Sequence, residues 1–180
     1  MLKRLFSSIF RPAEHELAIV RLYEQACEQA RSRVFYTALG VADEIDARFE
    51  LYTLHVLLLV MRLRDEGTPE GLEASQSLFD TYVSALDNTL RELGVGDLSI
   101  AKKMRKLGES LFGRMKAYEP LIRSQSEALP AALGRNVYGN EAASHAPALA
   151  DYVHRTRAHL AAQDIRELLQ ARVAWPEVVT

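Results

Sequence analysis

Histidines, a cysteine and spaced aspartates are the residues of this 180-residue sequence that could support metal binding or acid–base chemistry. A zinc site of the H-E-x-x-H type needs two histidines four residues apart on one helix face. His154 and His159 are five residues apart, so they do not share such a face. The other histidines show no metal-binding spacing either: His15, His55 and His145. We therefore predict no metal site.

Nucleophilic and acid–base catalysis are also weakly supported. Cys27 lies on an apolar face with no activating partner close in the sequence, so we interpret it as a core thiol. Asp80 and Asp87 are two helical turns apart and could form an acidic strip, but Asp87 can also pair with Arg91. His55 lies in an apolar helix, which favours a hydrogen-bonded core histidine over a ligand. The sequence predicts no catalytic residues, no cofactor and a protein that is not an enzyme.

The composition is that of an ordinary soluble domain with one core. Hydrophobic residues make up 48% and charged residues 26%, and the net charge of −2 gives no general affinity for nucleic acid. The single cysteine excludes a disulfide framework within the chain. The apolar run 51–63 is shorter than the roughly 20 residues that cross a bilayer. The N-terminus lacks the cleavage site of a signal peptide.

The elements that must position these residues are predicted to be helices, and no segment has the pattern of a strand. Apolar residues recur every three or four positions, which predicts helices over about 14–39, 43–66, 71–93, 98–118 and 147–172, with a short one near 129–138. The helix 43–66 is apolar on nearly all sides and belongs in the centre. Pro120 should end or kink its helix. We predict an all-α, single-domain bundle of about five to seven helices.

The motif L-G-V-x-D occurs twice, at 39–43 and 93–97, and each copy falls between two predicted helices. We interpret both as capped corners. Gly40 and Gly94 would adopt the left-handed conformation after a helix, while Asp43 and Asp97 would cap the next one. Phosphate binding at the second corner is the alternative. It is disfavoured because the G-x-x-x-x-G-K-[ST] spacing is absent and Asp97 would repel an anion. Gly67 and Pro69 should form the intervening corner.

A basic segment follows the second corner. Between Asp97 and Tyr118 there are six basic residues and two acidic ones, a local charge of +4. Such a run is commonly a solvated helix face, but it could also meet nucleic acid, a ribosome, lipid headgroups or an acidic partner. No aromatic platform is interleaved among Lys102, Lys103, Arg105 and Lys106, so sequence-specific nucleic-acid binding is not expected. The candidate basic surface is Lys102, Lys103, Arg105 and Lys106.

Residues 1–13 form a basic, amphipathic N-terminal segment. Its apolar residues fall at helical spacing, and its first 12 residues contain no acid. The segment could lie on an anionic membrane surface, or it could dock on its own domain. The candidate membrane contacts are Leu2, Lys3, Arg4, Leu5, Phe6, Ile9 and Phe10.

Four motifs in order carry a resemblance to a known family. They are D-x-R-F-E-L-x-x-L-H in 46–55, L-F-D in 78–80, R-E-x-G-V-G-D in 91–97 and F-G-R-x-x-A-Y in 112–118. Together they resemble the ubiquinol–cytochrome c chaperone family, whose members are assembly factors for respiratory complex III. The resemblance implies a helical chaperone domain over 14–175, followed by a tail at 176–180.

The resemblance also implies a function, which is to bind newly made cytochrome b before its assembly into the cytochrome bc complex. Mitochondrial relatives carry long targeting extensions, and this sequence lacks one. It therefore resembles a bacterial member that acts in the cytoplasm, peripherally at the inner membrane. Use of a small partner chaperone stays open. The alternative function is a membrane-peripheral adaptor that binds anionic lipid or an acidic partner through its basic helix.

We take the motif residues as candidates for contact with the client. A groove lined by apolar side chains could shield the client's helices, and charged faces could recognise its loops. Alternatively, several of these residues form the ion pairs and caps that hold the helices together. An enzyme with a cavity around His55 is a further alternative, and it would require a sizeable pocket. The client-contact candidates are Arg48, His55, Asp80, Asp87, Arg91, Glu92, Asp97, Arg114 and Tyr118.

Overall fold

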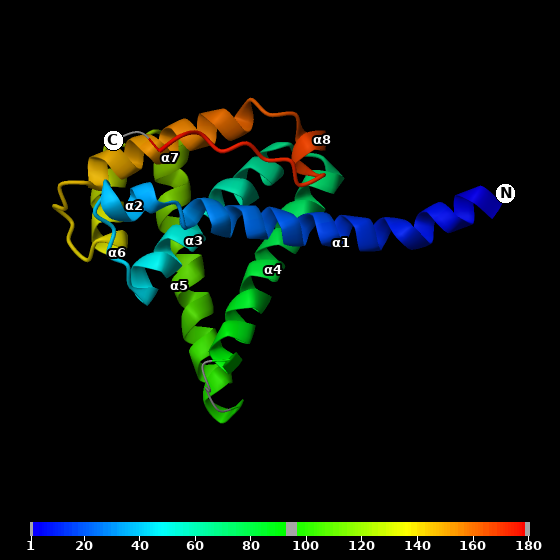
Figure 1. The fold of residues 1–180 in the computed structure, drawn as a ribbon, viewed down its shortest axis with the longest axis horizontal. Coiled ribbons are helices and arrows are strands. Elements are labelled where there is room, and N and C mark those ends of the chain that lie inside the picture. The colour runs from blue at the N-terminus through cyan, green and yellow to red at the C-terminus, as the bar shows by residue number, and fades with distance from the viewer. Residues whose placement is uncertain (1, 93–96, 179–180) are drawn as a thin grey trace.

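The computed structural model describes the backbone of residues 2–92 and 97–178, and the side chains of residues 15–92, 99–100 and 102–178. Over these ranges the chain forms helices and no strand, which confirms the all-α prediction (Figure 1). Six helices have nine or more residues, and α2 and α8 are short. The elements are α1 (Leu2–Ala30), α2 (Arg33–Thr37), α3 (Ile45–Asp65), α4 (Pro69–Glu92), α5 (Asp97–Arg123), α6 (Leu129–Val137), α7 (Ala146–Ala161) and α8 (Ile165–Leu168).

Helix α3 is the centre of the bundle, as its apolar sequence predicts. It packs against α1, α4, α5, α6 and α7. All residues from Thr53 to Met61 are buried, so the helix has no solvent-facing side over that stretch. A helix that is apolar on every side is stable only when other helices cover it. In the residues that the structure describes, no helix is long and apolar enough to cross a membrane.

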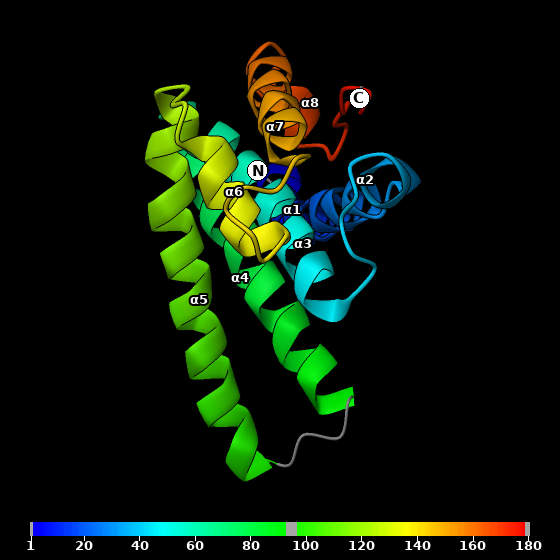
Figure 2. The ribbon, with the colours of Figure 1, turned by 90° about the vertical axis from the view of Figure 1, so that its left-hand side faces the viewer.

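Helices α4 and α5 form a long hairpin that projects beyond the other helices (Figures 1 and 2). The two helices contact each other, and Figure 2 shows both running toward the same end of the molecule. Pro120 does not end α5, which continues to Arg123, so the predicted end near residue 118 is wrong. A proline inside a helix lacks the N–H of one backbone hydrogen bond. That loss falls in the last turn of α5, where the helix tolerates it.

The predicted helix over 14–39 is two helices, which corrects that boundary. Ser32 has φ −53° and ψ 129°, an extended conformation that separates α1 from α2. The Tyr36 hydroxyl donates a hydrogen bond of 3.0 Å to the carbonyl of Ala30. This bond satisfies one of the carbonyl groups left unpaired where α1 ends. At its other end, the backbone of α1 extends through Pro12 to Leu2, and the predicted boundary at 13/14 lies within this helix (Figure 1).

The first glycine corner has the predicted conformation and a different cap. Gly40 has φ +63°, and Val41 is buried with its N–H bonded to the carbonyl of Phe35. Asp43 is not the N-cap of α3. Glu44 is the N-cap residue, and its side chain makes no capping hydrogen bond. The carboxylate of Asp43 accepts a hydrogen bond from Arg48 instead of capping the helix. The second corner, with Gly94 and Val95, lies outside the described residues.

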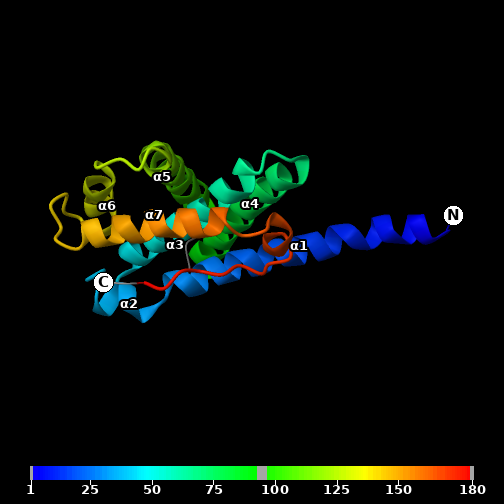
Figure 3. The same ribbon diagram turned by 90° about the horizontal axis from the view of Figure 1, so that it is seen from above.

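The predicted helix over 147–172 is also two helices. Helix α7 ends at Ala161, and α8 begins after Asp164, whose carboxylate accepts a hydrogen bond from the N–H of Arg166. The residues after α8 pass between α1 and α7 (Figure 3). Gln25 on α1 donates to the carbonyl of Ala171 at 2.7 Å, which ties this segment to the bundle.

The remaining boundaries agree with the sequence patterns. Gly67 has φ +71° and Pro69 is the first residue of α4, as predicted for that corner. Helix α6 covers Leu129–Val137, close to the predicted 129–138. Cys27 is a buried free thiol whose pKa is raised by burial, which confirms its interpretation as a core residue.

Candidate binding surfaces

Two of the predicted contact residues, His55 and Tyr118, are fully buried. Nδ1 of His55 lies 2.7 Å from the carbonyl oxygen of Leu51, and Nε2 lies 2.9 Å from the Tyr152 hydroxyl. Because a carbonyl can only accept, Nδ1 carries the proton and Nε2 accepts from Tyr152. Burial lowers the pKa of His55 to about 4, so the ring is neutral at pH 7. These contacts confirm its interpretation as a hydrogen-bonded core histidine.

The space around the His55 ring is filled by aromatic side chains. The rings of Phe35 and Trp175 lie edge-on to it, at centroid distances of 5.3 and 5.4 Å. His55 does not line the cavity between α2 and α3, the cavity between α3 and α7, or the depression where α3, α4 and α5 meet. The aromatic packing leaves no room for a substrate beside the ring, which argues against an enzyme site at this position.

Arg114 on α5 is paired with a residue that the motif analysis did not select. Its Nε and Nη2 lie 3.0 and 2.7 Å from Oε1 of Glu50, which is only 4% exposed on α3. The pKa of Glu50 is raised above its ordinary value because the effect of burial exceeds the opposing effect of the hydrogen bonds from Arg114. The sequence signal was a carboxylate placed among apolar residues in the first motif. The pair joins α5 to α3 and supports the structural alternative for Arg114.

The other candidates lie on or near the surface. Asp87 accepts a hydrogen bond from Arg91 at 2.7 Å, as predicted, and Asp80 accepts one from Gln76 at 2.9 Å. Glu92 is exposed at the end of α4. Asp97 begins α5, but its side chain is outside the described set, as are those of the N-terminal candidates from Leu2 to Phe10. Contact of any of these residues with a client therefore stays a prediction.

The outer face of α5 combines a large apolar side chain with positive charge. Phe112 is 64% exposed, and its ring lies 5.8 Å from that of Phe79 on α4. The predicted basic surface, Lys102, Lys103, Arg105 and Lys106, is exposed on the preceding turns. Phe112 follows Arg105 by seven residues, so the two share one side of the helix, whereas Lys103 precedes Phe112 by nine residues and lies on the opposite side. We use the name α5 face for Phe112 together with these four exposed basic residues of α5.

The predicted apolar groove is nearly filled. An apolar depression at the junction of α3, α4 and α5 has a volume of about 10 Å³. That is only about enough for one water molecule. Its lining consists of Thr53, Val56, Leu57, Val60, Phe79, Tyr82, Leu111 and Met115. In the described residues, the apolar binding surface on this side is therefore an exposed patch at Phe112 rather than a deep groove.

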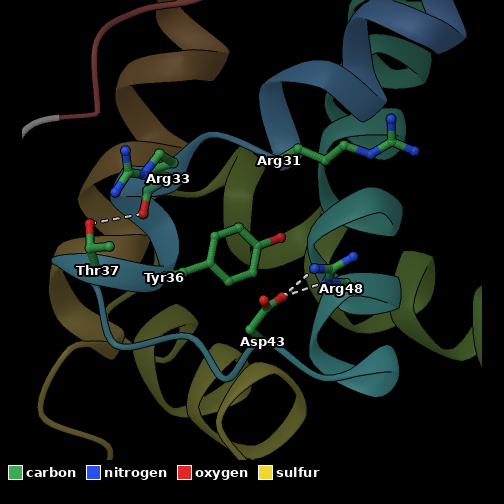
Figure 4. A pocket seen from close by; sticks show the side chains of 6 residues that line it. All are labelled: Arg31, Arg33, Tyr36, Thr37, Asp43 and Arg48. Carbon is green, nitrogen blue, oxygen red and sulfur yellow. Dashed lines mark hydrogen bonds and ion pairs between the residues drawn. The ribbon is translucent and has the colours of Figure 1, made fainter.

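A polar cavity lies between α2 and α3, and it contains Arg48 from the candidate set. Its volume is about 380 Å³, and Figure 4 shows its lining. Nε and Nη2 of Arg48 each lie 2.6 Å from the Asp43 carboxylate. The other lining residues, which the sequence analysis did not select, are Arg31, Arg33, Tyr36 and Thr37. They are brought together by the break after α1, which no proline or glycine marks in the sequence.

Comparison with known proteins gives concordant results. The family model described as "Ubiquinol-cytochrome C chaperone" matches residues 37–175. Ubiquinol-cytochrome-c reductase complex assembly factor 1 of Xenopus laevis is 22% identical over 167 residues, covering 91% of this chain and 83% of the relative. The Homo sapiens protein of the same description is 23% identical over 167 residues. That match covers 91% of this chain but only 56% of the human protein.

A solved structure is similar over nearly the whole chain. The crystal structure of the Cbp3 homolog from Brucella abortus matches with a TM-score of 0.85 and 31% sequence identity. The match covers 99% of this chain and 98% of that one.

Proposed function

Since the chain belongs to the ubiquinol-cytochrome C chaperone family, we propose that it is a non-enzymatic assembly chaperone of respiratory complex III that binds newly made cytochrome b. Membership of this family supports a role in assembly of ubiquinol–cytochrome c reductase. The proposal goes one step further and names cytochrome b as the protein that the chaperone binds. Similarity to the Cbp3 homolog from Brucella abortus over 99% of this chain supports a bacterial member. The proposal places its action in the cytoplasm, peripherally at the inner membrane.

The observation that carries the proposal is the α5 face. Phe112 is 64% exposed beside exposed basic residues, and aromatic residues together with arginine are enriched in protein-binding surfaces. Burying the rest of Phe112 against a client would contribute about 1–2 kcal/mol. The four neighbouring cations add attraction for acidic segments and raise the rate of encounter. A client that exposes apolar helices joined by charged loops would satisfy both parts of this surface.

The buried candidate residues have a supporting role in this proposal. Arg114 and Glu50 join α5 to the central helix, and Tyr118 is buried one turn further along α5. Together they hold α5 in place, so the α5 face is presented on a rigid helix. Five further contact candidates lie on α4 or at the start of α5, and Arg48 and His55 lie on α3. The five are Asp80, Asp87, Arg91, Glu92 and Asp97.

Capture of cytochrome b by purified protein tests the proposal. Phe112→Ser should reduce capture severalfold without changing the melting temperature, because its ring is largely outside the core. Leu72→Ser is the matched control, since Leu72 is 48% exposed on α4 but is not part of the α5 face. Equal capture by both variants would show that the α5 face is not the client-binding surface. Failure of the wild-type protein to capture cytochrome b would show that cytochrome b is not the client.

A further inference from the structure

The cavity between α2 and α3 has the charge and shape of an anion site. It is lined by Arg31, Arg33 and Arg48 against the single carboxylate of Asp43, which gives a formal charge of +2. The chain as a whole has a net charge of −2, so this local excess is opposite in sign to the whole molecule. A concave site with one sign of charge concentrates the electrostatic field and attracts a counter-ion.

The fold brings these cations together from separate elements. Arg31 and Arg33 flank the extended Ser32 between α1 and α2, and Arg48 lies in the first turn of α3. The chain returns from α2 to α3 through Gly40, whose φ of +63° favours glycine. Figure 4 shows Tyr36 between the side chain of Arg33 on one side and those of Arg31 and Arg48 on the other, with its hydroxyl directed toward α3.

Two of the arginines are held in place before any ligand arrives. Nε of Arg31 donates to the Tyr52 hydroxyl at 2.9 Å, and its guanidinium carbon lies 5.5 Å from the centre of that ring. Among described residues, the Nη atoms of Arg31 and the guanidinium of Arg33 have no hydrogen-bond partner. Arg48 is oriented by Asp43, which engages its Nε and Nη2. The Nη groups of Arg31 are therefore oriented and unpaired among the described residues, whereas Arg48 is oriented but paired with Asp43.

The hydroxyl groups in the cavity are already used. Tyr36 donates to the carbonyl of Ala30, and Thr37 donates to the carbonyl of Arg33 at 2.9 Å. The available donors are therefore guanidinium groups, whose planar forks match phosphate and carboxylate oxygens. A charge of +2 is balanced by a phosphate monoester but only half balanced by one carboxylate. The volume of about 380 Å³ lies within the range of small-molecule sites, so there is room for an organic part.

We propose that the cavity lined by Arg31, Arg33 and Arg48 binds a phosphate monoester, either in a soluble compound or in a lipid headgroup. This site is separate from the α5 face and does not depend on the identity of the client. Arg31 and Arg48 are the principal donors, and Asp43 competes with the ligand for Arg48.

Calorimetric titration with glycerol 3-phosphate, and sedimentation with vesicles of phosphatidylcholine containing phosphatidic acid, test the site. The wild-type protein should bind at least one probe saturably with Kd below about 1 mM. Arg31→Gln with Arg48→Gln should weaken binding at least about tenfold, because both charge-assisted donors are lost. Asp43→Asn should strengthen it severalfold, which a general loss of structure would not do. Circular dichroism confirms that each variant is folded.

Arg135→Gln with Arg166→Gln is the control, because it removes the same charge from exposed positions outside the cavity. This pair should leave binding unchanged. Binding of glycerol 3-phosphate identifies a soluble ligand, and binding confined to phosphatidic acid vesicles identifies a headgroup. Either result supports the site if it depends on Arg31 and Arg48. Absence of saturable binding to both probes, or equal weakening by the control pair, would overturn the proposal.

Discussion

Arg114 on α5 clamps the buried carboxylate of Glu50 on α3, donating from both Nε and Nη2. The two residues are 64 positions apart, so the pair joins the projecting hairpin to the central helix. Removing one member of a buried ion pair is costly because the other charge is left without a partner. The clamp therefore separates two roles on α5, since Arg114 maintains the helix position while Phe112 faces outward.

Loss of the clamp should lower stability. We expect Arg114→Ala to reduce the free energy of unfolding by about 2–4 kcal/mol, because Glu50 would remain as an unpaired buried carboxylate. Urea denaturation measures the change. Replacing both residues, as Glu50→Leu with Arg114→Leu, should cost less than Arg114→Ala alone. A cost equal to or above that of the single variant would show that the ion pair is not the source of the loss.

The buried His55 should make stability depend on pH. Its pKa is about 4 in the folded protein against an ordinary value of 6.5, so the unfolded chain binds a proton more readily. Folding stability is then fully present above pH 6.5 and falls as the pH drops toward 4. The expected slope is about 1.4 kcal/mol per pH unit within that window.

Thermal or urea unfolding measured between pH 7 and 5 tests this dependence. This range lies above most of the titration of the carboxylates. His55→Gln should be less stable at pH 7 but should show a much smaller slope. An unchanged slope in that variant would assign the pH dependence to another group.

The two left-handed glycine corners should respond differently to a methyl group. A Cβ at Gly40 would lie 2.8 Å from Cδ2 of His145, whereas a Cβ at Gly67 would have no atom within 4 Å. Both positions have positive φ, which costs roughly 1–2 kcal/mol for alanine. Gly40→Ala should therefore destabilise the protein more than Gly67→Ala in the same denaturation assay. Equal losses would mean that His145 moves aside freely.

The basic part of the α5 face should act mainly on the rate of client binding. Replacing Lys102, Lys103, Arg105 and Lys106 by glutamine removes four charges, which should slow association about tenfold at low salt. Because salt screens exposed charges, the difference should shrink as the ionic strength rises toward about 0.5 M. Stopped-flow or surface-based association measurements on a cytochrome b segment give both rates. A difference that persists at high salt would assign these residues a packing role.

The sequence pattern predicts the helices and the central position of α3 because apolar periodicity reports directly on burial. It does not predict the breaks after Ala30 and Ala161. Neither break has a proline or glycine. At the first break the Tyr36 hydroxyl donates to the carbonyl of Ala30, and at the second Arg62 on α3 donates to the carbonyls of Leu160 and Gln163. The second break also depends on Gln163, whose side chain accepts from the N–H of Ala174.

The contacts of the candidate site residues could not be predicted from the sequence either. The motifs identify Arg114 and His55 as candidates, but their partners Glu50 and Tyr152 are 64 and 97 residues away. The apolar neighbours of Glu50 in the sequence indicate that its carboxylate needs a partner, but which residue pairs with it is decided by the packed bundle. For the same reason, the cavity with Arg31 could not be predicted before the turn between α1 and α2 was known.

The most direct test of the central claim is crosslinking to cytochrome b during its synthesis. A photoreactive amino acid placed at Phe112 should crosslink to the nascent client, and one placed at Leu72 should give little product. This difference would identify the α5 face as the contact surface. Crosslinking at Leu72 but not at Phe112, or none at either position while cytochrome b is being made, would contradict the account.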